Sequence, residues 1–270
     1  MNSDRGLHAE VGRVVDASAY DRYIGRWSRL FVPSLLAAAE TATGHRVLDV
    51  ATGTGEAASA AISLVGPAGV VIGVDISRAM LGAACARLSE PYRAVVADGQ
   101  ALAFRNGSFD TVVCQLGLMF FPDPRRGLAE FRRVLRTGGS AAVCVPSTPE
   151  KVPMWSVLAQ ALSRRVPDQR AMLNLSFSLS DPDRLEQMLQ AAGCRDVRVA
   201  KETRHGGFAS YEEFWASIET GIGLLPLTYR TLPDAERRAV RKEADAKLAR
   251  FESNGRLEMS IEMLIGAGRA

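Results

Sequence analysis

Residues 46–56 read Arg46-Val-Leu-Asp-Val-Ala-Thr-Gly-Thr-Gly-Glu56. The first five residues form a mostly apolar run that predicts a buried strand, and an alanine-rich helix is predicted directly after the Gly53-Thr54-Gly55 turn. In an open α/β sheet such a turn lies at the carboxyl end of a strand, where these folds bind their ligands. Glycine allows the backbone to bend sharply and to approach a ligand closely. The stretch therefore predicts a ligand-binding loop at the edge of a sheet.

Asp49 is a charged residue inside this otherwise apolar strand. Burying an unpaired carboxylate costs several kcal/mol, so we expect Asp49 to accept hydrogen bonds from the loop and to shape a nucleotide pocket. A nicotinamide dinucleotide is one of the cofactors that could fit this loop. The spacing Gly53-x-Gly55-x-x-Ala58, with Asp75 about twenty residues on, matches the dinucleotide fingerprint, although the Asp-x-Ala-Thr step before the glycines makes a longer turn.

Two further apolar strands are predicted, over 70–75 and 92–98, and each ends on an acidic residue. Asp75 closes the first of them, and Ser77 can cap the helix that follows. A carboxylate has two acceptor oxygens, which suits two neighbouring ribose hydroxyls. Asp98 closes the other strand and leads into Gly99-Gln-Ala-Leu-Ala-Phe104.

These motifs together resemble class I S-adenosylmethionine (SAM) dependent methyltransferases, in particular the ubiquinone/menaquinone-biosynthesis type and its small-molecule relatives. The resemblance covers about Tyr20 to the end of the chain, with departures at Ala51, Gly99 and Ala103. It implies that Asp98 accepts from the adenine amine and that the Gly99 N–H donates to the ring. A dinucleotide enzyme gives no reason for an acidic residue at this third strand, so we expect SAM as the cofactor and S-adenosylhomocysteine as its product.

The resemblance also implies which residues bind SAM and which bind the methyl acceptor, and it implies no metal site. The expected SAM-binding residues are Asp49, Ala51, Thr52, Gly53, Gly55, Asp75, Ile76, Met80, Asp98, Gly99, Gln100 and Gln115. The expected acceptor-binding residues are Tyr20, Tyr23, Trp27, Leu118, Met119 and His205. No catalytic residue is assigned, and His205, expected after the sixth strand, is the candidate base. Phe120 and Phe121 are interpreted as core in preference to walls of the site.

The segment Tyr20–Ser28 is expected to be helical, after a frayed stretch over 1–16. Tyr20, Tyr23 and Trp27 recur at intervals of three and four, which is typical of one packing face of a helix. The resemblance implies instead a lid over the cofactor. Both interpretations remain open, because a lid must pack as well.

The implied fold class is α/β: a Rossmann-like, seven-stranded, mostly parallel sheet with an antiparallel last strand, helices on both faces and a helical cap. We expect one methyltransferase domain over 1–270, made of an N-terminal lid (1–45), a SAM-binding core (46–146), a substrate cap (147–193) and a C-terminal part that completes the sheet (194–270). Strands six and seven are predicted over 197–203 and 257–267, with an amphipathic helix over 233–252. The helix that carries Phe131 is predicted to end at Gly138-Gly139.

Composition excludes several function classes. The chain of 270 residues is 47% hydrophobic and 23% charged with a net charge of +3, and no run of like charges predicts nucleic-acid binding. The four cysteines are isolated in apolar segments, which predicts buried free thiols. No apolar stretch suits a membrane span or a signal peptide. We therefore expect a cytoplasmic protein whose partner is a small molecule, with the oligomeric state open and a homodimer as one alternative.

The main hypothesis is an enzyme that transfers a methyl group from SAM to O, N or C of a small hydrophobic metabolite. A second hypothesis is a SAM-binding protein that does not transfer methyl groups, and a third is a nicotinamide-dependent oxidoreductase. Formation of S-adenosylhomocysteine distinguishes the first from the second, and a cofactor-binding assay excludes or supports the third. The acceptor is not specified by the sequence.

Overall fold

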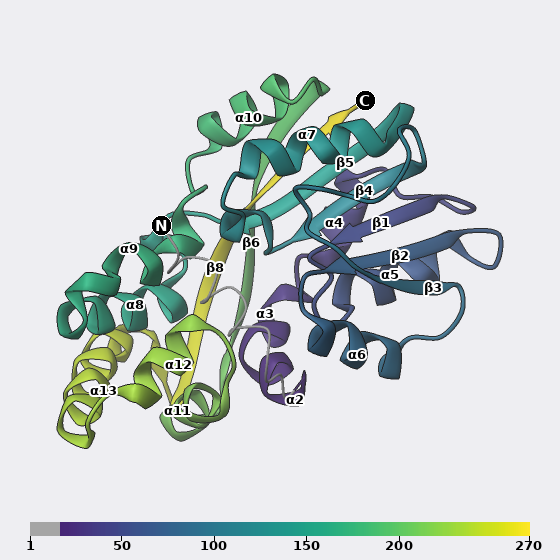
Figure 1. The fold of residues 1–270 in the computed structure, drawn as a ribbon. Coiled ribbons are helices and arrows are strands. Elements are labelled where there is room, and N and C mark those ends of the chain that lie inside the picture. The colour runs from purple at the N-terminus through teal and green to yellow at the C-terminus, as the bar shows by residue number, and fades with distance from the viewer. Residues whose placement is uncertain (1–16) are drawn as a thin grey trace.

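A computed structural model describes residues 17–270 and is built around one central sheet (Figure 1). The strand order is β3-β2-β1-β4-β5-β8-β6, and β8 runs antiparallel to both of its neighbours. A two-residue strand, β7, adds a short pairing on β8. The mostly parallel Rossmann-like sheet with an antiparallel last strand is thus confirmed. The strands are β1 (Arg46–Val50), β2 (Val70–Asp75), β3 (Tyr92–Val96), β4 (Phe109–Gln115), β5 (Leu135–Pro146), β6 (Arg195–Phe208), β7 (Glu252–Ser253) and β8 (Arg256–Arg269).

The central strands β1, β4 and β5 are apolar along most of their length because helices cover both faces of the sheet. Helices α4 (Val32–Ala38), α5 (Glu56–Val65) and α6 (Arg78–Arg87) lie on one face, while α7 (Pro124–Val134) and α10 (Pro182–Ala191) lie on the other (Figure 1). Consistent with two layers, α4 packs against α5 and α7 packs against α10.

The described chain begins with a helical segment made of α2 (Ala17–Tyr20), the π-helix η1 (Asp21–Gly25) and α3 (Arg26–Ser28). The helical region expected over Tyr20–Ser28 is therefore confirmed. A π-helical turn is uncommon and occurs frequently at functional sites. The frayed stretch expected over 1–16 lies outside the described residues.

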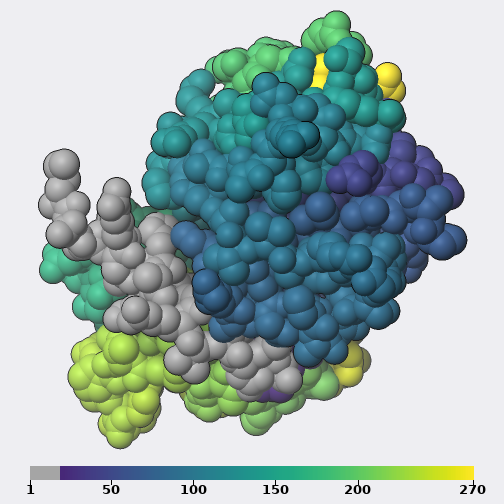
Figure 2. All heavy atoms as spheres, turned by 45° about the vertical axis from the view of Figure 1, so that its right-hand side comes forward, coloured from purple at the N-terminus to yellow at the C-terminus, as the bar shows by residue number. Residues whose placement is uncertain are grey.

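Most of the remaining helices gather around the end of the β6–β8 pair that extends beyond β5. In Figure 2 the C-terminal helices form a yellow-green lobe below the blue and teal half that contains the sheet. In this group α8 packs against α9, α12 and α13. The elements are η2 (Leu118–Phe120), η3 (Pro149–Lys151), α8 (Pro153–Arg165), η4 (Pro167–Gln169), α9 (Arg170–Leu173), η5 (Leu175–Phe177), α11 (Tyr211–Thr220), α12 (Leu224–Thr231), α13 (Asp234–Leu248) and η6 (Ala249–Phe251). Across residues 17–270, none of the helices is both long enough and apolar enough to cross a membrane.

Two local predictions need correction, and two helices were missed. Helix α7 ends at Val134, and Gly138-Gly139 belong to β5, because the β4–β5 pairing reaches back to Phe109 and Leu135 with a bulge in between. Helices α11 and α12 were not predicted, although Ser210-Tyr-Glu-Glu213 is a capping-box pattern and the Ser210 hydroxyl does accept from the Glu213 N–H. The thiol of Cys85 is exposed, whereas the other three cysteines are buried as expected.

Strand six is longer than predicted and continues to Phe208. Strand β5 ends at Pro146, which lies opposite Met263 of β8. Beyond this point β6 and β8 continue as a pair as far as Phe208 and Leu257. We call residues 204–208 and 257–261 the ribbon. Because β6 runs parallel to β5, the ribbon projects past the carboxyl edge of the sheet, where the predicted ligand site lies.

Candidate functional site

The loop after β1 lies at the carboxyl edge of the sheet, as predicted. It is held by hydrogen bonds from the Thr52 N–H to the Val74 carbonyl (3.0 Å) and from the Gly55 N–H to the Thr52 carbonyl (2.9 Å). Its two glycines differ in their surroundings. Both have a positive φ, but a Cβ on Gly55 would lie 2.7 Å from Leu88, whereas among residues 17–270 a Cβ on Gly53 would meet only the Tyr20 hydroxyl, at 4.0 Å. Of these two glycines, Gly53 therefore faces the less crowded space in the described chain.

Asp75 joins this loop to the one that follows β2. Its Oδ2 accepts from the Gly53 N–H (2.9 Å) and its Oδ1 accepts from the Ser77 N–H (2.8 Å). Burial raises the pKa of the Asp75 carboxyl, although the two backbone donors act in the opposite direction. The Ser77 hydroxyl accepts from the Met80 N–H, which begins α6 as expected.

Asp49 lies completely buried under the loop. Its Oδ2 accepts from the Thr52 hydroxyl at 2.6 Å, and its Oδ1 has no hydrogen-bond partner among residues 17–270. Burial raises the pKa of Asp49 to about 7. The expected hydrogen bond to the loop is present, but it comes from a side chain, and the carboxyl group retains a proton to nearly neutral pH.

Asp49→Asn should remove a pH-dependent part of the stability. In the folded protein Asp49 binds its proton up to about pH 7, whereas in the unfolded chain it loses the proton near its ordinary pKa of about 3.9. Between these values the folded state binds more protons, so the wild-type free energy of unfolding should fall as pH rises, by up to about 1.4 kcal/mol per pH unit. Urea denaturation of both proteins across this range measures the slope. Identical slopes would show that Asp49 titrates normally.

Strand β3 ends at Val96, two residues before the predicted end at Asp98. Asp98 lies in the loop that follows, where it is exposed and its Oδ1 accepts from the backbone N–H of Gln100 (2.8 Å). The Gln100 side-chain amide also donates to Asp98 (3.1 Å), and its oxygen accepts from the Asp123 N–H (2.8 Å). Gly99 lies beneath Phe121, because a Cβ on Gly99 would lie 2.4 Å from that ring. Gln100 thus fixes the Asp98 carboxylate in place.

Three large apolar side chains at this edge remain exposed. Ile76 after β2 is 65% exposed, Val96 at the end of β3 is 47% exposed, and Phe120 in η2 is 38% exposed. The interpretation of Phe120 as core was therefore wrong, whereas Phe121 does pack against Phe131. Leu118 and Met119 are buried in the core.

The N-terminal helices lie over the carboxyl ends of β1 and β4. The Asp21 carboxylate accepts from the Thr54 hydroxyl (3.0 Å) and from Arg87 (3.1 Å). The Gln115 side chain, at the end of β4, donates to the Ser28 carbonyl (3.1 Å). Burial, with additional effects of Asp75, Asp21 and Glu56, raises the pKa of Tyr20.

The same helices contact the ribbon on their other side. Trp27 packs so closely on Gly206 that a Cβ there would lie 2.9 Å from its ring, and Arg26 donates to the Gly207 carbonyl (2.8 Å). Tyr23 and Trp27 are almost completely buried, which fits a packing face. Yet the Tyr23 hydroxyl and the Trp27 Nε1 have no hydrogen-bond partner within the described chain.

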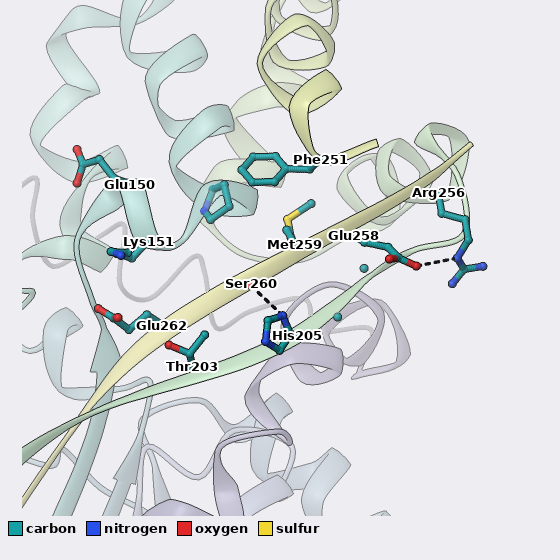
Figure 3. Close-up of a pocket in the computed structure, with 13 residues that line it drawn as sticks. Glu150, Lys151, Thr203, His205, Phe251, Arg256, Glu258, Met259, Ser260 and Glu262 are labelled. Atoms are coloured by element: carbon teal, nitrogen blue, oxygen red, sulfur yellow. Dashed lines mark hydrogen bonds and ion pairs between the residues drawn. The ribbon is translucent and has the colours of Figure 1, made fainter. Parts of the chain in front are cut away.

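A hollow of about 760 Å³ lies beside the ribbon, beyond the end of β5 (Figure 3). Phe251 and Met259 lie on one side of β8 in this view, and His205 and Thr203 extend from β6 on the other. His205 therefore lies within β6 and not after it, and its Nδ1 is 2.9 Å from the Ser260 hydroxyl. The structure places His205 on the ribbon and the predicted SAM-binding residues around the loops after β1, β2, β3 and β4.

Sequence reasoning missed several residues at this edge. Val96 was not proposed because its exposure depends on where β3 ends. Glu262 lines the hollow and its Oε1 accepts from the hydroxyl of Ser147, the residue after β5 (2.7 Å). Ala51 and Leu116, after β1 and β4, adopt the left-handed backbone conformation that is rare for residues other than glycine. No pattern in the sequence indicates these features.

Comparisons with known proteins agree with this geometry. Residues 48–143 match the family model described as "Methyltransferase domain". Demethylmenaquinone methyltransferase of Staphylococcus carnosus is 29% identical over 194 residues, which cover 67% of this chain and 79% of the relative. The enzyme of the same name from Lactococcus lactis is 30% identical over 188 residues, covering 64% and 73% respectively.

The fold is also that of a solved structure, phosphoethanolamine N-methyltransferase 2 of Haemonchus contortus in complex with SAM. The TM-score is 0.62 at 18% identity, and the match covers 100% of this chain and 60% of that one. From the sequence matches, the chain belongs to the class I SAM-dependent methyltransferases, in the quinone-biosynthesis-like family of small-molecule enzymes.

Proposed function

We propose that SAM lies along the carboxyl edge of β1, β2 and β3, with Asp75 at its ribose. The observation that carries this placement is that Asp75 connects the loops after β1 and β2 while its side chain stays partly accessible. Each carboxylate oxygen accepts one backbone N–H, and a carboxylate has about four lone-pair sites. Asp75 therefore retains the capacity to accept two ribose hydroxyls.

The adenine would lie between the exposed apolar side chains Ile76, Val96 and Phe120, with Asp98 at its amine. Exposed apolar groups gathered at one edge favour a planar apolar ligand. Gln100 would act indirectly by holding Asp98. The buried Asp49, Thr52 and Gly55 would shape the loop from below, so we expect Gly53 and Asp75 to contact the cofactor more directly.

SAM supplies an electrophilic methyl group, and the protein's main task is to hold an acceptor atom in line with it. The acceptor would lie over the ends of β4 and β5, above Leu118 and Met119. Strands β1, β4 and β5 are adjacent, so β5 lies about 10 Å from β1 across the sheet, and it ends at Pro146, three residues beyond the level of the end of β1. The hollow beside the ribbon begins there, and its volume falls within the range of small-molecule sites.

His205 is the candidate base in this hollow. Its Nδ1 is engaged with Ser260, so its Nε2 is the nitrogen that could exchange a proton with an acceptor hydroxyl. His205→Gln keeps a polar side chain beside Ser260 but cannot accept and release the proton, so it should lower turnover of a hydroxyl acceptor while SAM binding stays normal. Unchanged turnover in this variant would exclude this role.

The test of the function is direct. Calorimetry should show that the protein binds SAM more tightly than NAD. Release of S-adenosylhomocysteine should then be measured with a panel of aromatic hydroxyl compounds and amines, including a reduced demethylmenaquinone analogue because of the relatives' names. Tighter binding of NAD, or no release with any acceptor while SAM is bound, would contradict the proposal.

Residues 17–45 are proposed to act as a lid and residues 147–193 as a cap that selects the acceptor. The lid would close over the glycine loop through Asp21 and over β4 through Gln115. Amide exchange in residues 20–28 should slow when S-adenosylhomocysteine is added, while β1 stays protected throughout. Exchange that is slow and unchanged by the ligand would identify the segment as a fixed structural element.

A further inference from the structure

The inner end of the hollow is formed by Glu262, whose side chain is bonded to Ser147 behind it. Figure 3 shows Glu262 and Lys151 at the end nearest the core of the sheet, with Arg256 and Glu258 at the opposite end. Ser147 is buried, and its hydroxyl donates to Glu262 Oε1 while its N–H donates to the Glu262 carbonyl (3.1 Å). The carboxylate is therefore held in a defined position.

Glu262 is also close to the expected site of methyl transfer. Ser147 lies three residues beyond Cys144, which pairs with Gln115 at the end of β4. At about 3.3 Å per residue, this places Ser147 about 10 Å along β5 from that pair. The hollow therefore lies further along the direction of β5 than this pair, and Glu262 is the lining residue of β8 that lies nearest to it.

The charges in the hollow are not equivalent. Glu258 forms an ion pair with Arg256 (3.4 Å), and both side chains are more than half exposed. Glu262 is only partly exposed and has no cationic partner in the part of the chain that the structure describes. Its Oε1 has one hydroxyl donor, so the carboxylate retains further acceptor capacity. The adjoining wall is apolar, with Met259, Phe251 and Pro153.

We propose that Glu262 is a specificity-determining residue that accepts a hydrogen bond from the acceptor molecule, and that this molecule joins an apolar body to a protonated amine. The proposal rests on the proposed function, because it assumes that the hollow is the acceptor site. A partly buried carboxylate without a cation favours a positively charged donor, accepts more weakly from a neutral hydroxyl and repels an anion. The apolar wall would receive the rest of the molecule.

The experiment compares three probes of similar shape: phenethylamine, phenethyl alcohol and hydrocinnamate. Their binding is followed by ligand-observed NMR in the presence of saturating S-adenosylhomocysteine. The wild type should bind the amine most tightly, with the alcohol weaker and hydrocinnamate weaker by about ten-fold or more. Ten-fold corresponds to about 1.4 kcal/mol, which is within the range for a hydrogen bond to a charged group.

Glu262→Gln keeps an acceptor oxygen for Ser147 but removes the charge. It should weaken amine binding by about ten-fold and leave alcohol binding nearly unchanged. Glu202→Gln is the matched control, since Glu202 lies on the neighbouring strand β6 but does not line the hollow and pairs with Arg204, so this change should leave all three affinities unchanged. Thermal unfolding of both variants checks the fold.

Several results would overturn the proposal. These are hydrocinnamate binding as tightly as the amine, no amine binding at millimolar concentration, or equal effects of the two substitutions. The affinity for S-adenosylhomocysteine is measured first in each protein. If this affinity is normal and the three probes bind equally well, the role proposed for Glu262 is wrong while SAM binding stands. If the wild type does not bind S-adenosylhomocysteine, the proposed function itself fails.

Discussion

Gly53→Val should abolish SAM binding while the protein stays folded. Gly53 has a φ of +56°, and among the described residues only the Tyr20 hydroxyl lies within 4.0 Å of a Cβ at this position, where we propose that the cofactor lies. A valine side chain would fill that space and would also be strained at this φ, at a cost of order 1–3 kcal/mol. Typical domains have a stability of about 5–15 kcal/mol, so the fold should survive. Calorimetry and circular dichroism measure the two effects.

Gly44→Val is the matched control. Gly44 also has a positive φ, of +80°, and a Cβ at this position would have no neighbouring atom within 4 Å in the part of the chain that the structure describes, but Gly44 precedes β1 at the opposite edge of the sheet. The variant should therefore lose similar stability and bind SAM normally. Normal binding by a folded Gly53→Val protein would show that the loop after β1 does not hold the ligand.

Asp75→Ala should weaken SAM binding by ten-fold or more. The substitution removes the proposed acceptor for two ribose hydroxyls, and hydrogen bonds to charged groups contribute about 1.5–3 kcal/mol each, where ten-fold is about 1.4 kcal/mol. It also releases the Gly53 N–H, which Asp75 holds at 2.9 Å, so the glycine loop loses its support as well. Both effects act in the same direction, and calorimetry measures their sum.

Asp110→Ala separates loss of the ligand contact from general loss of stability. Asp110 also holds a backbone donor, the Arg46 N–H at 2.7 Å, but at the opposite end of β1. This variant should lose stability without losing affinity for SAM. Equal affinity of wild type and Asp75→Ala would contradict the assignment of the ribose site.

The sequence by itself determined the fold class and the position of the ligand edge. Alternation and apolar runs located β1 and β2 to within a few residues, because strands buried on both faces must be apolar throughout. The glycine turn and the acidic residues at strand ends then placed Gly53, Asp75 and Asp98 at one edge, since parallel strands share their carboxyl ends. Local chemistry and topology were sufficient to place these residues at one edge, whereas the seven-stranded fold class followed from the resemblance to class I methyltransferases.

Only the tertiary structure decided which groups meet. The hydrogen bond from Gly53 to Asp75 joins residues 22 positions apart, and that from Ser147 to Glu262 joins residues 115 apart. Similarly, Gly55 resembles Gly53 in the sequence, yet it packs against Leu88 and not toward open space. Such contacts depend on how the helices and the ribbon pack on the sheet. The spacing of residues along the chain carries no information about which distant residues pack together.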